Sequence, residues 1–153
     1  MRNLQELGVT SKGSGSKLPA DELLIREFEN RFGLKLPDDF RLFLRTVPDG
    51  GSPLKKIFRR TGEVWGVNRF RGLVRTKADA GLVGAMHTWG DVLGPNRVPF
   101  AGDGCGNEFV LDLNHTPSPV LIVVHEEDFK TVVLAPSFGE FIDGLEEMSV
   151  DEV

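Results

Sequence analysis

The chain has 153 residues, with 18 basic and 23 acidic side chains that give a net charge of −5. This length suits one domain, and the negative charge argues against nucleic acid or an anionic membrane as the main partner, because both attract clustered positive charge. An apolar fraction of 40% excludes the class of disordered chains. The 18 glycines and 9 prolines favour many turns and therefore a share of β structure.

Cysteine content and hydropathy indicate where the protein works. The single cysteine, Cys105, excludes an internal disulfide and a multi-thiolate metal site, which is typical of a protein in a reducing compartment. No stretch of the sequence approaches the ~18 apolar residues of a membrane span. The first residues form no apolar signal segment. The sequence therefore predicts a cytoplasmic protein without a cofactor or a metal ion.

The N-terminal residues are predicted to lie outside the folded domain. Residues 1–17 end in the polar run Ser11–Lys17, which is rich in serine and glycine and offers nothing to bury. This composition is typical of a flexible arm. We therefore expect one domain over residues 18–146, followed by an acidic tail over residues 147–153.

Two short amphipathic helices are predicted next. Leu24, Phe28 and Phe32 lie four residues apart and therefore share one helical face. Gly33 can adopt the left-handed conformation that ends a helix, and Pro37 suits the start of a second helix because its missing N–H has no partner there. The apolar stripe of the second helix consists of Phe40, Phe43, Leu44 and Val47. The two helices are expected to form a hairpin.

The following part of the chain favours strands. Apolar runs separated by turn residues predict strands over residues 57–58, 63–67, 97–101, 108–112, 120–124 and 131–134. Pro99 suggests an edge position for its strand, since proline cannot donate to a sheet ladder. A helix over residues 78–87 is also possible, but Gly81 and Gly84 weaken it by about 1 kcal/mol each.

A capping box marks the start of the last predicted helix. The Ser137 side chain can accept a hydrogen bond from the third helical amide, and Glu140 can reach back towards it. The short connections between the predicted strands favour antiparallel pairing. The sequence therefore predicts an α+β domain, in which an N-terminal helical hairpin and a C-terminal helix pack on a mainly antiparallel sheet.

The glycine-rich segment Gly102–Asn107 allows several interpretations. A strand follows it, whereas a phosphate-binding loop requires a helix N-terminus at that point. A calcium loop that begins at Asp103 would need a glutamate at its twelfth position, where the chain has Asn114. The favoured interpretation is a tight turn between strands, with Cys105 as a small buried filler. The alternative is a catalytic Cys105 activated by a histidine, either His115 or His125.

Other polar and aromatic residues have a functional and a structural interpretation. His125 with Glu126, Glu127 and Asp128 could offer metal ligands, but a solvated acidic turn is favoured because four consecutive loop residues rarely converge on one ion. Trp65 and Trp89 are interpreted as packing residues, or one of them as an interface anchor. A basic cluster beside Phe58 could bind single-stranded nucleic acid, but a solvated strand edge is favoured. This cluster consists of Lys55, Lys56, Arg59 and Arg60.

Read in order, three segments resemble signatures of the SUKH superfamily. The first combines Ile25 and Phe28-Glu29 with Gly33-Leu34-Lys35-Leu36-Pro37-Asp38-Asp39-Phe40 and Asp49-Gly50-Gly51. The second is Gly106-Asn107-Glu108-Phe109-Val110-Leu111-Asp112. The third joins Val120–His125 to Ala135-Pro136-Ser137-Phe138-Gly139-Glu140-Phe141. The chain departs from the usual pattern at Phe40, Asp49 and Asn107, where tyrosine, asparagine and aspartate are common. The matches cover roughly residues 18–145.

The resemblance implies an α+β fold with a curved antiparallel sheet and a binding protein rather than an enzyme. Bacterial members of the superfamily bind and block the catalytic domain of a polymorphic toxin encoded beside them, which favours an immunity protein that acts as a monomer or weak homodimer. Fungal members regulate the cell wall, so a non-catalytic scaffold is the alternative. A small enzyme that uses Cys105 is a third possibility.

An acidic protein could recognise a nuclease or another intracellular toxin by charge. Negative side chains in exposed loops would steer the chain onto a basic cleft and raise the association rate, and binding would weaken with salt. The residues predicted to contact the partner are Asp103, Glu108, Glu126, Glu127 and Asp128.

Overall fold

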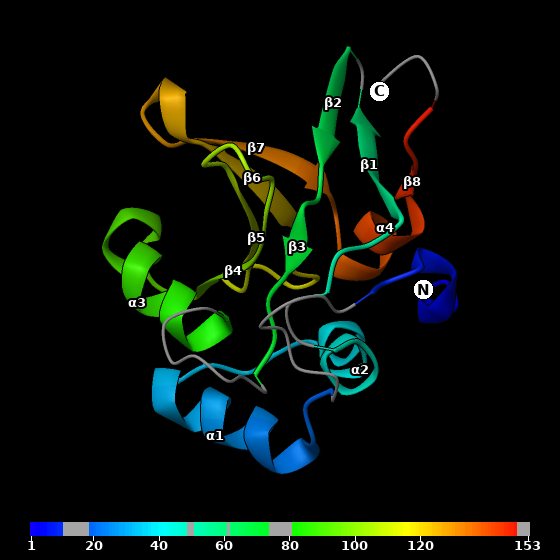
Figure 1. The fold of residues 1–153 in the computed structure, drawn as a ribbon. Helices are drawn as coiled ribbons and strands as arrows, with labels where there is room; N and C mark the ends of the chain where they lie inside the picture. Colours follow the sequence, from blue (N-terminus) through cyan, green and yellow to red (C-terminus); the bar gives the residue numbers. More distant parts are fainter. Residues whose placement is uncertain (11–18, 49–50, 61, 74–80, 150–153) are drawn as a thin grey trace.

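The computed structural model describes residues 1–10, 19–48, 51–60, 62–73 and 81–149, and Figure 1 shows their arrangement. The elements in chain order are η1 (Leu4–Leu7), α1 (Glu22–Phe32), α2 (Asp38–Thr46), β1 (Lys55–Arg60), β2 (Glu63–Gly66), β3 (Arg69–Phe70), α3 (Leu82–Leu93), β4 (Arg97–Gly102), β5 (Glu108–Asp112), β6 (Val120–Val124), η2 (His125–Glu127), β7 (Lys130–Ala135), α4 (Phe138–Asp143) and β8 (Glu146–Glu147). The predicted α+β class is therefore confirmed.

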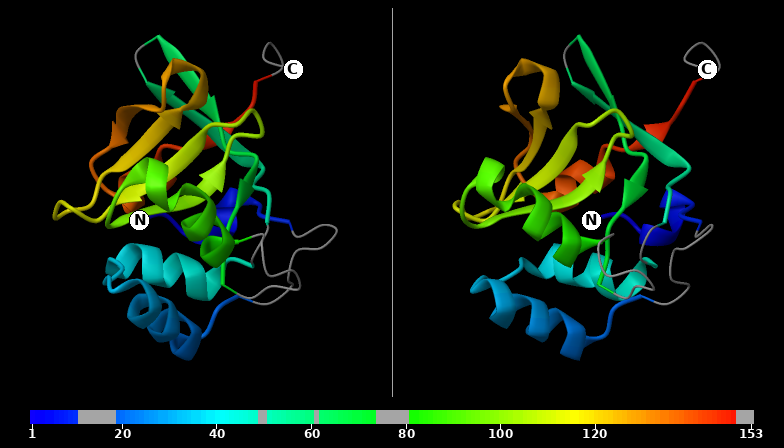
Figure 2. Two further views of the ribbon diagram at one scale, coloured as in Figure 1. Left: turned by 90° about the vertical axis from the view of Figure 1, so that its left-hand side faces the viewer. Right: turned by 60° about the vertical axis from the view of Figure 1, so that its left-hand side comes forward.

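The N-terminal helical hairpin forms as predicted. The Asp21 side chain accepts a hydrogen bond from the Leu24 amide and so caps α1, and Gly33 ends the helix at a φ of 64°. Pro37 occupies the N-cap position of α2. Figure 2 shows α1 and α2 stacked side by side below the strands. The hairpin thus closes one end of the molecule.

The described strands form two antiparallel sheets. One sheet has the order β3-β4-β5-β6-β7, and the other has the order β2-β1-β8. Strand β4 lies between β3 and β5, but β3 pairs only with Ala101 and Gly102. Among the described strands, Pro99 has a ladder partner on β5 alone, so its own position is at an edge although β4 as a whole is not an edge strand. The ladder between β4 and β5 shifts register between Pro99 and Ala101, and such an irregularity accommodates proline inside a sheet.

The core lies between the inner face of the five-stranded sheet and the helices α2 and α4. Along β5 and β6 alternate side chains point to opposite faces, and the inner ones belong to one large cluster. Phenylalanines dominate this cluster; Phe100 has ring contacts with Phe40, Phe109, Phe138 and Phe141 at centroid distances of 5.3–6.5 Å. The capping box is confirmed, because the Ser137 hydroxyl accepts from the Glu140 amide at 3.2 Å.

The first ten residues pack against the domain, so the interpretation of this part as a flexible arm is wrong. Leu4 and Leu7 of η1 are buried. The Arg2 guanidinium donates to the backbone carbonyls of Ile142 and Leu145 at 3.1 and 2.7 Å, where α4 ends. Residues 11–17 of the predicted arm lie outside the described residues.

The C-terminal segment also differs in part from the predicted tail. Glu146 and Glu147 form β8, which pairs with β1. The predicted tail began at residue 147, so its first residue is part of a sheet. Residues 150–153 lie outside the described residues.

The helix α3 begins later than predicted. Gly81, which was expected to weaken the interior of this helix, stands at its N-cap with a φ of 130°, a conformation that glycine adopts without strain. The helix then continues to Leu93, through Gly84 and Gly90. Residues 78–80 of the predicted helix lie outside the described residues.

Candidate functional site

The glycine-rich segment forms the turn between β4 and β5. Gly104 and Gly106 have φ values of 84° and 94°, which glycine adopts without strain. The predicted tight turn between strands is confirmed. The Asp103 carboxylate accepts from the amides of Cys105 and Asn107 at 2.7 and 3.0 Å and from the Asn107 side chain at 2.7 Å. Asp103 is half-buried, and its oxygens are occupied by its own turn.

The interpretation of Cys105 as a buried filler is wrong, because this side chain is exposed at the tip of the turn. Cys105 precedes β5, whereas His115 follows the last residue of this strand. The five residues of β5, at about 3.3 Å each, therefore separate the thiol from the imidazole of His115. A catalytic pair of Cys105 and His115 is therefore excluded. His125 approaches the same turn, since its backbone N–H donates to the Asn107 Oδ1 at 3.0 Å. In the described part of the chain, no hydrogen bond joins the Cys105 thiol to an imidazole.

Glu108 is a buried strand residue, so its predicted place among exposed loop acids is wrong. Its side chain is 6% exposed, and both carboxylate oxygens accept from the Arg71 guanidinium, the Nη2–Oε1 distance being 2.8 Å. Burial raises the pKa of Glu108, while the hydrogen bond and charge of Arg71 act in the opposite direction. A polar hollow of about 280 Å³ adjoins this pair, lined among others by Asn68, Gly104 and Asn107. Because Glu108 neutralises Arg71, this arginine is not free to hold an anion.

Glu126, Glu127 and Asp128 are exposed, in the turn between β6 and β7. Asp128 and the next residue, Phe129, both have positive φ values, 54° and 58°. The Phe129 ring lies 6.0 Å from the Trp89 ring and 5.5 Å from that of His125, each in an edge-to-face arrangement. The structure thus keeps these three of the predicted contact residues accessible, and adds an aromatic group beside them.

Sequence reasoning missed Phe129 and Val133, which are 39% and 50% exposed. Val133 lies in the run Thr131–Leu134, which predicts a strand but does not say which side chains face the core. The one feature of the sequence that indicated an exposed Phe129 was its place directly after three acidic residues.

The basic cluster lies on β1, which is the central strand of the three-stranded sheet. The predicted strand edge is therefore wrong. Lys55 is opposite Glu147, and the Arg59 guanidinium pairs with the Glu146 carboxylate. Two of the four basic residues thus face acidic residues of β8.

Two polar residues of the first signature, Glu29 and Asp39, bind the chain itself. Glu29 accepts from the Leu36 amide at 2.7 Å and from the Arg41 guanidinium at 2.6 Å, which fixes the loop between α1 and α2. Asp39 accepts from the Gly139 amide at 2.9 Å. This contact caps the N-terminus of α4 from α2, two elements a hundred residues apart.

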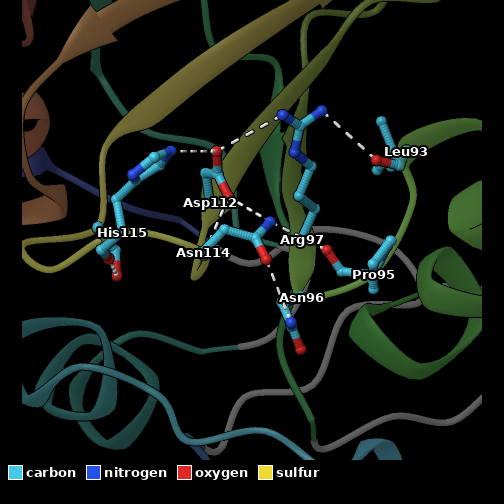
Figure 3. Close-up of polar contacts among 8 residues, drawn as sticks. Leu93, Pro95, Asn96, Arg97, Asp112, Asn114 and His115 are labelled. Carbon is cyan, nitrogen blue, oxygen red and sulfur yellow. Dashed lines mark hydrogen bonds and ion pairs between the residues drawn. The ribbon is translucent and has the colours of Figure 1, made fainter.

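The last aspartate of the second signature has the same kind of role (Figure 3). The buried Asp112 accepts from the Asn114 amide and side chain at 3.0 and 2.8 Å and lies 3.6 Å from the Arg97 guanidinium. His115 is 3.9 Å away and largely exposed. The network continues from Asn114 to the Asn96 side chain at 3.2 Å. It therefore joins the start of β4 to the end of β5, at the end of the hairpin opposite its turn.

The sequence matches the model of the SMI1 / KNR4 family (SUKH-1) over residues 19–144. The chain belongs to this family. The resemblance to the SUKH superfamily is thereby confirmed, and comparison with curated proteins gives no match. For this SUKH-1 member, the signature residues Glu29, Asp39, Asn107 and Asp112 have hydrogen bonds within the fold. The acidic turn with Phe129 is an exposed feature that none of these contacts explains.

Among the residues that the structure describes, no group of three or more histidine, cysteine, aspartate or glutamate side chains could hold a metal ion. None of the helices in the same ranges combines the length and the apolar character that a membrane crossing requires.

Proposed function

We propose that this SUKH-1 protein is an immunity protein, which binds the catalytic domain of a cognate toxin in the cytoplasm and blocks it. The toxin is a nuclease or another effector that acts inside the cell. The proposal combines family membership over residues 19–144 with the contacts of the signature residues.

The single observation that carries the proposal is how the signature carboxylates are used. Glu29, Asp39 and Asp112 each accept hydrogen bonds from backbone amides of their own chain. A carboxylate that serves as a catalytic acid or base must instead reach a substrate. These three signature carboxylates therefore serve the architecture, which supports a role in binding.

Charge supports the choice of partner. Glu126, Glu127 and Asp128 are exposed on one turn of a chain with a net charge of −5. Such a surface attracts a basic active site, as in an enzyme that acts on nucleic acid, and mainly raises the association rate. Asp103 and Glu108 support this less, because both carboxylates already have partners within the chain.

The test is co-expression with the C-terminal domain of the large secreted protein encoded by the adjacent gene. If the proposal is correct, that domain alone stops cell growth and the full chain restores it. Growth arrest that persists despite soluble full chain, or an adjacent gene that encodes no toxin, would contradict the proposal. In that case a non-catalytic scaffold of the Smi/Knr type is the remaining interpretation.

A further inference from the structure

The outer face of the five-stranded sheet is only partly covered. Its covered part consists of Val110, Leu121 and Val123, with Leu93 and Trp89 of α3 packed against them. Val133 of β7 is opposite Leu121 in the ladder and therefore shares this face, yet it is 50% exposed. In the described part of the chain β7 is also the last strand of its sheet. Figure 1 shows α3 and the turn before β7 on the side of the molecule away from β1 and β2.

Phe129 directly precedes β7 and extends this apolar area to the start of that strand. Its ring is 39% exposed and rests edge-on against Trp89. Its backbone has a φ of 58°, which is unusual for a bulky residue and easy for glycine. Glycine would suit this backbone conformation better, so the ring is present at a cost in backbone strain, although part of it packs on Trp89 and His125. Aromatic side chains held rigidly at a surface are the usual anchors of protein interfaces.

The charges around Phe129 indicate the kind of partner. Between His125 and Lys130 the turn carries three carboxylates and one ammonium group. A second copy of the chain would bring the same acidic turn, and two chains of charge −5 repel each other. A basic surface fits this rim, because opposite potentials across an interface fix register and exclude wrong partners.

We propose that Trp89, Phe129 and Val133, named here the Phe129 patch, form the docking surface for the toxin domain. The contacting surface of that domain is basic, and one of its apolar side chains packs on Phe129 inside the rim of Glu126, Glu127 and Asp128. This inference rests on the proposed function and adds the face and the chemistry of the contact.

The experiment is calorimetric titration of the full chain with the purified toxin domain of the adjacent gene. Two single variants probe the patch. Phe129→Gly removes the ring and suits the backbone at this position, and Val133→Asp places a charge on the outer face. Each is expected to weaken binding by about tenfold or more, the effect of losing an interface anchor.

A matched valine on another exposed strand serves as the control. Val64 of β2 is 53% exposed, so Val64→Asp makes the same chemical change away from the patch. It is expected to alter the dissociation constant by less than about threefold. Far-UV circular dichroism and the unfolding midpoint of each variant separate loss of contact from loss of fold.

Charge is tested by two double variants with the same net charge. Glu126→Lys with Glu127→Lys is expected to weaken binding by about tenfold at low salt and to flatten its salt dependence. Glu27→Lys with Glu63→Lys changes the total charge equally at other exposed positions and is expected to keep most of the affinity.

The outcomes distinguish the two proposals. If the wild-type chain does not bind the toxin domain, the proposed function fails and this inference fails with it. If it binds and the patch variants bind equally well, the immunity function stands and the Phe129 patch is overturned. If sedimentation shows a dimer that Val133→Asp dissociates, the patch is occupied by a second copy, which also overturns the inference.

Discussion

The two faces of the five-stranded sheet use alternate residues of the same strands but have different neighbours. On the inner face, Phe109 and Ile122 meet the phenylalanine-rich core beneath α2 and α4. On the outer face, Val110 and Leu121 meet the end of α3, and Val133 meets solvent. This difference shows that an apolar residue in a strand does not necessarily contribute to the stability of the domain. The inner face holds the domain together, whereas the outer face keeps apolar surface available for a partner.

The largest expected effect is on the inner face. Phe100 is fully buried and touches four other phenylalanine rings. Phe100→Ala should lower the free energy of unfolding by about 3–5 kcal/mol, because it leaves a cavity that the rigid sheet cannot close. Urea unfolding measures this loss.

The matched change on the outer face should cost far less. Phe129→Gly removes an exposed ring and relieves a positive φ, so the free energy of unfolding should change by less than about 1 kcal/mol. If Phe129→Gly lowers the free energy of unfolding as much as Phe100→Ala does, the Phe129 ring belongs to the core. That result would contradict the difference between the two faces.

The second prediction concerns the network that closes the β4–β5 hairpin (Figure 3). Asp112→Ala leaves the Asn114 amide and the Arg97 guanidinium without a buried acceptor and should destabilise the protein by about 1–3 kcal/mol. His115→Ala is the control, because this exposed side chain lies 3.9 Å from the same carboxylate and should matter little. Equal effects of the two variants in thermal unfolding would contradict a structural role for Asp112.

The third prediction is a dependence of stability on pH. Burial raises the pKa of Glu108 in the folded state, so above about pH 4.5 the folded chain holds a proton that the unfolded chain has already released. The contribution of Glu108 to stability is therefore largest at low pH and falls as the pH rises through this window. Compared with Glu108→Gln, which does not titrate, the wild-type protein should lose stability as the pH rises above about 4.5. A difference that stays constant, or grows in favour of the wild type, would show that Arg71 outweighs burial.

The smallest effect is expected at Cys105. Its side chain is exposed at the tip of the β4–β5 turn, so Cys105→Ala should change the free energy of unfolding by less than about 0.5 kcal/mol. Protection against the toxin should be unchanged as well, because no step of the proposed function uses the thiol. Loss of protection in a stably folded Cys105→Ala variant would favour the enzyme interpretation instead.

Local patterns in the sequence predict much of the fold. The helical hairpin follows from the four-residue spacing of Leu24, Phe28 and Phe32, and the start of α4 follows from Ser137 and Glu140. These signals lie within one or two helical turns, so they can be recognised without knowledge of the rest of the chain. Most of the strands over residues 97–134 follow from apolar runs between turns in the same way.

Features that depend on distant contacts could not be predicted. Glu108 resembles a loop acid beside a glycine turn, but Arg71, 37 residues earlier, neutralises it inside the sheet. The first ten residues are fixed through Arg2 by carbonyls near the other end of the chain. Likewise, the exposure of Val133 on β7 depends on which strand is the last one of the sheet, and this order is set by pairing between strands. The sequence therefore predicted only part of the candidate site, namely the acidic turn of Glu126, Glu127 and Asp128 without Phe129.

The central claim is that the protein acts by binding a partner protein, and one titration tests it most directly. The purified toxin domain of the adjacent gene is mixed with increasing amounts of the full chain while its catalytic activity is recorded. The account predicts that activity falls in proportion to added chain and is lost near equimolar amounts. Toxin activity that stays unchanged at a large excess of folded chain would contradict the account.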